Sequence, residues 1–482
     1  DTSSLSRTDM IRYWSLGMQL HKDILNYQPI SEEDRRLLTE GKDLATKGSI
    51  HCVNLAQGLK EPVVYWQLAQ DPIYLEATAK GLEDIKRFNG FPTGMFGGDE
   101  CLHGNNPAQG SELCSAVELM YSMEEMVKIT GNLSYVDHLE RVAFNALPTQ
   151  TSDDFTLHQY FQQVNQVNMV EGWHLFDIDN GKTSLVMGFL TGFPCCLCNL
   201  HQGWPKFTQN LWYTTDDGGL AALAYAPCSM SADIAGTKVS IVEDTYYPMD
   251  GKITFEITPD APVTFPLTLR IPSWTTSEAT LSVNGEPITG LIAGQTKTIS
   301  REWKNGDKVV LELPMTLTID RWFENSVSVE RGPLVYCAEW ADNSCNVLNV
   351  LLNRKPKFEL GSKMIANTEV QTLTTSAQTL AYDESGRMTV KDESLVLIPY
   401  YAWAHRGNGN MAVWLPYDLT ATTPQTPPTI ASQSKIGSSR RIGALSSLND
   451  GFAPKSAEDR SMPYCHWWPA KNNTEWLTYT FK

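Results

Sequence analysis

The sequence has little positive charge and no local block of lysine or arginine. It contains 38 Lys and Arg against 55 Asp and Glu, which leaves a formal net charge of −17. Proteins that bind nucleic acid neutralise phosphates with basic side chains, so we expect no nucleic-acid partner. The chain also lacks an uninterrupted apolar run near the roughly 20 residues that a membrane-spanning helix needs, so we expect no membrane span. The sequence therefore predicts a soluble, globular protein.

Cysteine is too sparse for a disulfide-stabilised scaffold, because the 482 residues contain ten. Half of these lie close together in the sequence, at Cys101, Cys114, Cys195, Cys196 and Cys198. Cys195 and Cys196 are adjacent, so a bond between them would depart far from ordinary disulfide geometry. We interpret the thiols as metal ligands, as a reactive thiol beside a ligand, or as buried small hydrophobic residues.

The sequence also lacks an initiating methionine and a recognisable signal peptide. It begins at Asp1 with no basic stretch followed by an apolar segment of about 7–15 residues. It ends in the strand-like run Trp476–Lys482 with no turn signal after it. We expect a fragment at both ends.

Residues 1–212 carry the apolar spacing of helices, with hydrophobic side chains three and four residues apart. The segment Asp71-Pro-Ile-Tyr-Leu-Glu recurs as Asn132-Leu-Ser-Tyr-Val-Asp, and each is expected to start a helix. The period of about 60 residues fits two helices with their loops, although two similar helix starts can arise by chance. This region is therefore a candidate α/α repeat, and stacked helical hairpins that close into an (α/α) toroid would place the repeat loops around a central cavity.

From residue 213 to 421 the pattern changes to short β-branched or alternating runs separated by Gly, Pro and Asp. Asn284-Gly285 predicts a two-residue hairpin turn. We expect one or two antiparallel β-sandwiches here, and hence a multidomain α+β fold. Residues 422–439 are rich in Pro, Thr and Ser and are predicted to be a linker. After the linker, Tyr464-Cys-His-Trp-Trp468 resembles the opening of a galactose-binding-like sandwich, so residues 440–482 are expected to be the truncated start of such a β domain.

The first group of residues that could carry chemistry includes Asp99 and Glu100, in a loop whose glycines suit a turn holding acids at the mouth of a cavity. It continues at Glu112 and Cys114. Residues two apart in a regular helix are separated by about 200°, so Glu112 and Cys114 can converge on one ion only where the first turn is distorted or Glu112 precedes the helix. The alternative is that Glu112 is an acid favoured at a helix N-terminus.

The second group is the segment Thr191-Gly-Phe-Pro-Cys-Cys-Leu-Cys-Asn199, in which a turn precedes a predicted helix start. A thiol in such a position has a lowered pKa and the character of a reactive thiolate. Zinc accepts cysteine sulfur and carboxylate oxygen. Glu112, Cys114 and two of the three thiols in residues 195–198 are therefore a candidate four-ligand set.

Several strings resemble glycoside hydrolase family 127, the β-L-arabinofuranosidase-like proteins, over roughly residues 50 to 420. They are Gly98-Asp-Glu100, Gly110–Glu118, Cys195-Cys196 with Asn199 and His201–Lys206, Arg331–Tyr336 and Tyr400–Ala404. The resemblance implies an (α/α)6 toroid followed by β-sandwiches. It also implies a zinc ion held by one Glu and three Cys, and retaining hydrolysis with a zinc-bound Cys as nucleophile.

Carried onto this sequence, the family pattern assigns zinc to Glu112, Cys114, Cys195 and Cys196. It makes Cys195 the nucleophile and Glu100 the general acid/base. This division of roles is chemically coherent, because retaining glycosidases pair a nucleophile with an acid about 5 Å away, and a thiolate can replace the second carboxylate.

The sequence departs from the family pattern at three points. Leu197-Cys198 stands where better-known members have Pro-Pro, so Cys198 is a competing ligand. The Gly-Asp-Glu context indicates a divergent subgroup, which makes Asp99 an alternative acid. The residues before the β region supply about half of the twelve helices of a full toroid, so we expect N-terminal helices to be missing.

Aromatic and histidine side chains near these groups are candidates for sugar contacts. His103, His158, Tyr160 and Trp204 are predicted to bind substrate, and Trp173 could also line the site. The alternatives are hydrogen-bonded structural histidines and ordinary aromatic core packing.

The function predicted from the resemblance is a zinc-dependent retaining glycosidase that releases terminal β-L-arabinofuranose or a similar plant cell-wall sugar from a glycan. The alternatives are a polysaccharide lyase, which can share a toroid-plus-sandwich architecture, and a non-catalytic carbohydrate-binding protein. The acidic pI near 5.0 and a glycan substrate favour a periplasmic or secreted bacterial location, with the cytoplasm as the alternative. The sequence assigns no oligomeric state.

Overall fold

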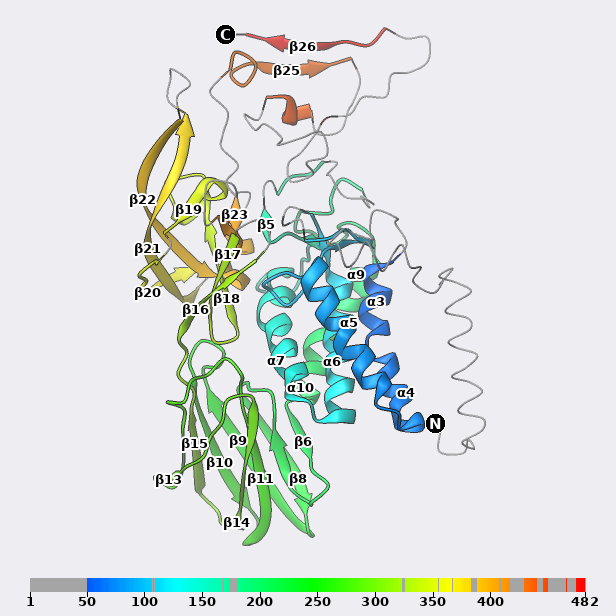
Figure 1. Ribbon diagram of the computed structural model, residues 1–482, viewed down its shortest axis with the longest axis vertical. Coiled ribbons are helices and arrows are strands. Elements are labelled where there is room, and N and C mark those ends of the chain that lie inside the picture. Colours follow the sequence, from blue (N-terminus) through cyan, green and yellow to red (C-terminus); the bar gives the residue numbers. More distant parts are fainter. Residues whose placement is uncertain are drawn as a thin grey trace.

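The protein combines a helical layer with two successive β units (Figure 1). The computed structural model describes residues 50–481 except 106, 108, 167–168, 173–180, 323–325, 354, 366, 383–387, 407–409, 417–428, 440–444, 450–464 and 466–473. The helices predicted from Arg7 and Ser31, and the candidate residue Trp173, lie outside the described residues. Among the described residues, no helix is both long and apolar enough to cross a membrane.

The helical layer is built around α6, which is buried on nearly every side. Apolar residues occupy all faces of this helix, including Leu113, Val117, Met120 and Met123, as expected for a central helix. Helices α3, α4, α7, α9 and α10 all contact it. The bounds of the helices are α3 (Cys52–Gly58), α4 (Glu61–Ala69), α5 (Ile73–Asn89), α6 (Leu113–Thr130), α7 (Leu133–Arg141), the π-helix η2 (Val142–Ala146), α8 (Leu147–Thr149), α9 (Cys195–Leu200) and α10 (Gly203–Gln209).

Both predicted helix starts of the repeated motif are confirmed. Helix α5 begins at Ile73, after Asp71-Pro72. Helix α7 begins at Leu133, where the Asn132 side chain accepts a hydrogen bond from the backbone N–H of Ser134. The interval from the first motif start to the second holds two helices, α5 and α6, with residues 90–112 between them, as the period predicted. The described helices leave the toroid itself untested.

The expected helical pattern fails between residues 150 and 194, where the described residues form turns and the short strands β4 (Phe161–Gln162) and β5 (Asn165–Gln166). At the start of this stretch the Asp154 carboxylate accepts hydrogen bonds from the hydroxyls of Ser152 and Thr156 and from the Thr156 N–H. Local side-chain bonds of this kind satisfy the backbone in a turn and compete with a helix.

A small sheet closes one end of the helical layer. Its strands are β1 (Gly98–Asp99), β2 (Cys101–Leu102) and β3 (Ser111–Glu112), and they pair with β4 in the order β2-β1-β3-β4. A bridge between His51 and Cys101 ties the start of α3 to this sheet. The loops on both sides of α6 are thereby held at one end of the helix.

The first β unit consists of two sheets that face each other across a common core. Trp212 of the four-stranded sheet packs edge-on against Phe255 of the six-stranded sheet, with ring centroids 5.8 Å apart. The predicted turn at Asn284-Gly285 is confirmed, since both residues have positive φ and join β12 to β13. One sheet has the order β13-β12-β15-β10-β9-β8 and the other β14-β11-β7-β6. The bounds are β6 (Trp212–Thr214), β7 (Leu220–Ala222), β8 (Cys228–Ile234), β9 (Thr237–Thr245), β10 (Lys252–Pro259), β11 (Val263–Ile271), β12 (Thr280–Val283), β13 (Glu286–Ile288), β14 (Gln295–Trp303) and β15 (Asp307–Glu312).

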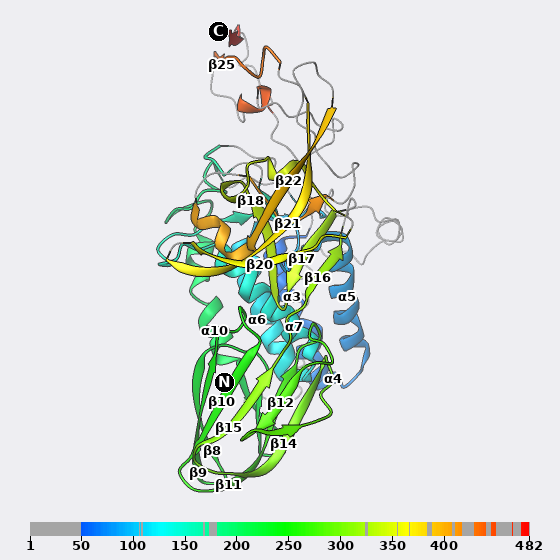
Figure 2. The ribbon, with the colours of Figure 1, turned by 90° about the vertical axis from the view of Figure 1, so that its left-hand side faces the viewer.

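The second β unit is one ten-stranded sheet with the main order β16-β17-β18-β22-β21-β19. Figure 1 shows the two β units end to end with the helical layer along one side, and in Figure 2 the helices lie behind the β units. Strand β5 of the helical region joins the sheet through β23, which anchors the loop after β4. The bounds are β16 (Leu317–Arg321), β17 (Ser326–Arg331), β18 (Leu334–Glu339), β19 (Val350–Leu352), β20 (Glu359–Ile365), β21 (Thr368–Tyr382), β22 (Met388–Pro399), β23 (Met411–Ala412) and β24 (Leu415–Pro416).

The described C-terminal residues form a separate pair of strands, β25 (Lys435–Ser438) and β26 (Leu477–Thr480). Strand β25 lies inside the range predicted as linker, so the described part of residues 422–439 is not wholly irregular. The composition of this range, rich in Ser and Thr, does not distinguish a linker from a short solvated strand. Residues 417–428 of the predicted linker lie outside the described residues.

Candidate metal centre and active site

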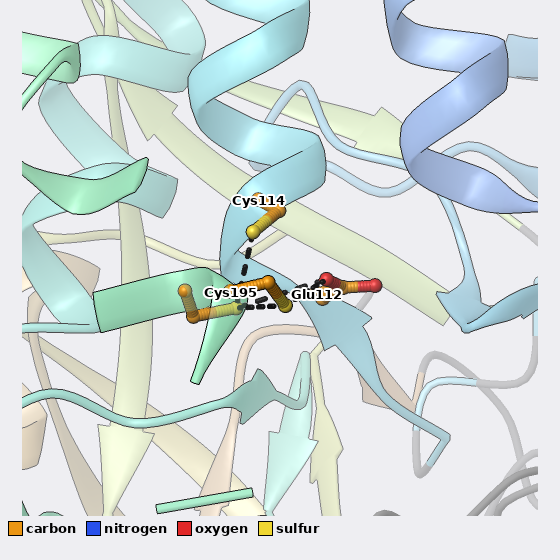
Figure 3. Close-up of side chains that lie close together, drawn as sticks. Glu112, Cys114 and Cys195 are labelled. Atoms are coloured by element: carbon orange, nitrogen blue, oxygen red, sulfur yellow. Dashed lines mark hydrogen bonds between the residues drawn. The ribbon is translucent and has the colours of Figure 1, made fainter. Parts of the chain in front are cut away.

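One carboxyl group and three thiols lie close together at the N-terminal end of α6. They belong to Glu112, Cys114, Cys195 and Cys196. One ligand atom from each lies within 4.8 Å of the other three. The sulfur atoms of Cys114 and Cys196 are 3.4 Å apart, and Glu112 Oε1 is 3.6 Å from Cys195 Sγ and 3.7 Å from Cys196 Sγ. Figure 3 shows Glu112 and Cys114 extending toward Cys195 from a strand end and a helix start.

Glu112 and Cys114 converge because the helix begins between them. Glu112 has extended backbone angles, with φ −74° and ψ 140°, and ends strand β3. Leu113 is the first residue of α6, and its N–H donates to the carbonyl of Tyr160. The geometric condition set by the sequence is therefore met by a strand-to-helix junction, and the 200° rotation of a regular helix does not apply.

The thiols from the other segment lie in the first turn of α9. Gly192 precedes them with a positive φ, and a Cβ there would lie 2.3 Å from the ring of Tyr160, so this turn requires a glycine. Cys196 is fully buried and Cys195 is partly exposed. Cys198, the competing ligand, is exposed on the same helix and is not part of the four-residue group.

The electrostatics of this group favour a bound cation. Burial, together with the nearby Glu100 carboxylate, raises the pKa of Glu112 to about 8. Burial also raises the pKa of the Cys196 thiol, whereas hydrogen bonds from Cys114 and Cys196 lower the pKa of Cys195. Four acids this close cannot all ionise without a compensating positive charge.

The donor set fits zinc. Sulfur and oxygen atoms about 2.0–2.3 Å from a tetrahedral ion are about 3.3–3.8 Å apart. Four of the separations in the group lie between 3.4 and 4.0 Å, and all ligand atoms lie within 4.8 Å of one another. Thiolate donors favour zinc over the hard cations calcium and magnesium, which prefer oxygen. The residues present could therefore hold a tetrahedral zinc ion.

Glu100 lies beside this group at the turn between β1 and β2. Its φ of 81° is unusual for a residue with a side chain, and such backbone strain is concentrated at functional sites. Its Oε2 is 2.9 Å from His51 Nε2, and its Oε1 accepts a hydrogen bond from the Tyr160 hydroxyl. The same hydroxyl lies 3.8 Å from Cys195 Sγ. One tyrosine thus contacts both the predicted acid and the predicted nucleophile.

Asp99 occupies a different environment from Glu100. It is fully buried and receives a long hydrogen bond of 3.5 Å from Gln109 Nε2. The acid that the structure brings into contact with Tyr160 and His51 is Glu100. This arrangement favours Glu100 over Asp99 as the acid/base.

The other predicted substrate contacts differ in their surroundings. His103 is buried, and its Nε2 lies 2.9 Å from the carbonyl oxygen of Gly110. Trp204 packs against Phe144 and Phe207 in the helical core. His158 is 1% exposed, and its Nε2 has no hydrogen-bond partner among the described residues, so it remains a candidate for a polar contact with substrate.

Sequence reasoning missed His51 and Cys52, which lie at the start of α3. His51 contacts Glu100, and the Cys52 thiol donates to Glu112 Oε2 at 3.4 Å. His51, Glu100 and Glu112 also offer ligand atoms within 4.8 Å of one another. The available signal was a His-Cys pair directly before a helix, which by itself has no characteristic spacing to any other candidate residue.

Comparisons with known proteins identify the family of the chain. Three sequence families match, described as the β-L-arabinofuranosidase GH127 catalytic domain over residues 8–209, the GH127 middle domain over 219–315 and the glycoside hydrolase family 127 C-terminal domain over 321–416. A non-reducing end β-L-arabinofuranosidase of Bifidobacterium longum is 25% identical over 335 residues, which are 64% of this chain and 49% of that protein.

Solved structures give the same picture of the fold. A GH127 β-arabinofuranosidase is 28% identical with a TM-score of 0.67, covering 78% of this chain and 61% of that one. A GH127 β-L-arabinofuranosidase from Geobacillus stearothermophilus T6 is 24% identical with a TM-score of 0.64, covering 76% of this chain and 60% of that one. The chain spans about half the length of the curated relative and about three fifths of these two structures.

Proposed function

Because this chain belongs to glycoside hydrolase family 127, we propose that it is a retaining glycosidase that releases terminal β-L-arabinofuranose or a similar plant cell-wall sugar from a glycan. The observation that carries the proposal is the contact of the Tyr160 hydroxyl with both Glu100 and Cys195, beside the Glu112 and cysteine group. A proton donor and a sulfur nucleophile are thereby separated by one hydroxyl. The Bifidobacterium longum relative is a non-reducing end β-L-arabinofuranosidase, which supports the choice of sugar.

We propose that the metal is zinc and that its ligands are Glu112, Cys114, Cys195 and Cys196. The separations and the burial of these donors support this set. Zinc bound there would keep the Cys195 thiolate deprotonated near neutral pH and make it a better leaving group. The exposed position of Cys198 supports leaving it out.

The reaction proceeds in two displacements. The Cys195 thiolate attacks the anomeric carbon while the bond from that carbon to the leaving oxygen breaks, and Glu100 gives its proton to that oxygen. A thioglycosyl bond to Cys195 results. Glu100 then takes a proton from water, the water oxygen attacks the anomeric carbon, and the carbon–sulfur bond breaks. Two inversions leave the anomeric configuration unchanged and return the thiolate and the protonated acid.

Tyr160, His51 and His158 would position the sugar and the acid. His51 holds the Glu100 carboxyl through a 2.9 Å contact that leaves the other oxygen to Tyr160. The Glu100 contact raises the pKa of His51, so this ring would stabilise the Glu100 carboxylate that the first displacement leaves. His158 Nε2 would meet a sugar hydroxyl. We also propose that the helical layer is part of an (α/α)6 toroid followed by β-sandwiches.

The test measures zinc per chain and turnover of an aryl β-L-arabinofuranoside by the full chain and its variants. We expect one zinc ion per chain, inactive Cys195→Ala, and Glu100→Gln that keeps its zinc but loses turnover. Cys198→Ala, which removes the exposed thiol of the same helix, is the matched control and should keep both.

Full activity of Cys195→Ala or Glu100→Gln would refute the mechanism. Product of inverted configuration would also refute it, since a covalent intermediate on Cys195 requires retention. An unsaturated product that absorbs in the ultraviolet would identify a lyase instead.

A further inference from the structure

His51, the N-cap of α3, and Cys52, its first residue, each contact one carboxyl group of the site. His51 Nε2 is 2.9 Å from Glu100 Oε2, and Cys52 Sγ donates to Glu112 Oε2 at 3.4 Å. The other oxygen of Glu112, Oε1, is the one that faces the sulfur atoms of Cys195 and Cys196. The two oxygens of Glu112 therefore have different partners.

Cys52 is fixed in this position by backbone bonds and close packing. Its N–H donates to the carbonyl of Glu100 at 2.7 Å, and the N–H of Leu102 donates to the carbonyl of Ile50 at 3.0 Å. The backbone of Gly98 lies so near that a Cβ there would be 2.4 Å from Cys52 Cβ. The thiol is fully buried, so neither water nor a rotation of the segment replaces its bond to Glu112.

We propose that Cys52 is a positioning residue. Its thiol donates a hydrogen bond to Glu112 Oε2 and thereby orients Glu112 Oε1 toward zinc. In a dry site, a carboxylate oxygen without a donor is costly, and a carboxyl held at one oxygen presents the other in a single direction. Partners of this kind orient metal ligands and are often worth a factor of about 10–100 in metal affinity. This role rests on the zinc site of the proposed function and concerns an interaction outside its four ligands.

A different role for Cys52 would be that of a metal ligand in place of Glu112. The geometry argues against it, because Cys52 is absent from the group whose ligand atoms all lie within 4.8 Å of one another. The orienting role predicts three thiolates on the ion, and the ligand role predicts four.

The experiment measures the zinc affinity of the full chain by competition with a chromophoric chelator. Cys52→Ala should bind zinc about 10–100-fold more weakly than the unmodified chain, because Glu112 loses its donor. Cys52→Ser keeps a hydroxyl donor and should lie closer to the unmodified chain than to Cys52→Ala. Cys337→Ala, which removes a fully buried thiol from β18 in the second β unit, is the matched control and should leave the affinity unchanged.

Substitution of cobalt for zinc separates the two roles. The sulfur-to-cobalt charge-transfer absorption of Cys52→Ala should have the intensity of the unmodified chain, since no ligand is lost. A fall by one thiolate would identify Cys52 as a ligand and overturn the orienting role.

The outcomes also separate this inference from the proposed function. An unmodified chain that binds no zinc would refute the metal centre and the role of Cys52 together. Zinc binding by the unmodified chain with equal affinity in Cys52→Ala would refute the role of Cys52 alone. Near-ultraviolet circular dichroism shows that each variant is folded before its affinity is compared.

Discussion

The Tyr160 hydroxyl is the point at which the predicted acid and nucleophile meet. It donates to Glu100 and lies 3.8 Å from Cys195 Sγ. Burial raises the pKa of Tyr160, so the hydroxyl keeps its proton throughout the neutral pH range. A permanent donor between a carboxylate and a thiolate holds both in place and stabilises negative charge on either.

Replacing Tyr160 by Phe should therefore lower kcat/KM without unfolding the protein. A hydrogen bond to a charged group contributes about 1.5–3 kcal/mol, which corresponds to roughly a tenfold to hundredfold loss. The measurement is turnover of an aryl arabinofuranoside from pH 5 to 8. Tyr401→Phe, which removes a buried hydroxyl without a described partner in the second β unit, is the control. Equal activity of Tyr160→Phe and the unmodified chain would contradict the role assigned to the hydroxyl.

At this scale the sequence indicated the Glu112 and cysteine group, which the structure brings together, but not the residues that contact it. Glu112 and the cysteines stand out because carboxylate and thiol types cluster along the chain, and the strand-to-helix junction at Glu112 satisfies the geometric condition that their spacing set. His51 and Cys52 could not be found in this way. They reach Glu100 and Glu112 across 49 and 60 residues, and a single His-Cys pair carries no pattern that points to either acid.

The elements that hold the site are short and depend on close backbone approach. The hairpin of β1 and β2 carries Glu100 at its turn, and the start of α3 lies directly against it. Gly98 makes this contact possible, since a Cβ there would be 2.4 Å from Cys52 Cβ and 3.3 Å from Cys52 Sγ. The close approach of these two backbones sets the position of Glu100, because the N–H of Cys52 donates to the Glu100 carbonyl.

A methyl group at Gly98 should therefore separate α3 from the hairpin. We expect Gly98→Ala to destabilise the protein by about 1–3 kcal/mol, the usual cost of overpacking, and to weaken zinc binding. Gly81→Ala in α5 is the control, because nothing lies within 4 Å of its Cβ position and alanine should stabilise that helix by up to about 1 kcal/mol. Urea unfolding measures the stability of both variants. A Gly98→Ala protein as stable as the unmodified chain would contradict the packing argument.

Sequence patterns predicted elements where the signal was local. The starts of α5 and α7 and the turn at Asn284-Gly285 depend on capping and turn residues within a few positions, and all three are confirmed. The helical prediction was wrong for the described residues between 150 and 190, which form turns and short strands. There the side chain of Asp154 and pairings with distant segments, such as β5 with β23, decide the backbone.

Buried polar contacts join the helical layer to both β units. Arg270 of β11 is fully buried and forms ion pairs with Asp137 and Glu140 of α7, the second at 2.5 Å. On the other side, Asn145 accepts from the N–H of Val335 and donates to the carbonyl of Pro333. These partners lie between 130 and 190 residues apart, so no local pattern could reveal them. The first turn of α6, which carries Cys114, belongs to the layer that these contacts hold.

The loss of unfolding free energy on replacing Arg270 measures how much its ion pairs stabilise the helical layer against the first β unit. Glu140 is fully buried, and it also accepts hydrogen bonds from the Tyr247 hydroxyl at 2.5 Å and the Tyr225 N–H at 3.1 Å. Arg270→Met leaves this carboxylate without its cation, which should cost about 3–5 kcal/mol in urea unfolding at pH 8. Combining it with Glu140→Leu should recover part of that loss, because the unpaired buried charge is gone. A single variant as stable as the unmodified chain would show that the pair does not hold the layer.

The loss should also depend on pH with a definite sign. Burial raises the pKa of Glu140, and the Arg270 guanidinium opposes this, so removing Arg270 raises the pKa further. A carboxyl whose pKa is higher in the folded than in the unfolded state binds an extra proton on folding between those two values. Stability is then greatest below the unfolded pKa of about 4.3 and falls as pH rises through the folded pKa. Arg270→Met should therefore be closer to the unmodified chain at pH 5 than at pH 8. The double variant should not show this change, since it has no carboxyl at residue 140. An equal pH dependence in the single and double variants would place the titrating group elsewhere.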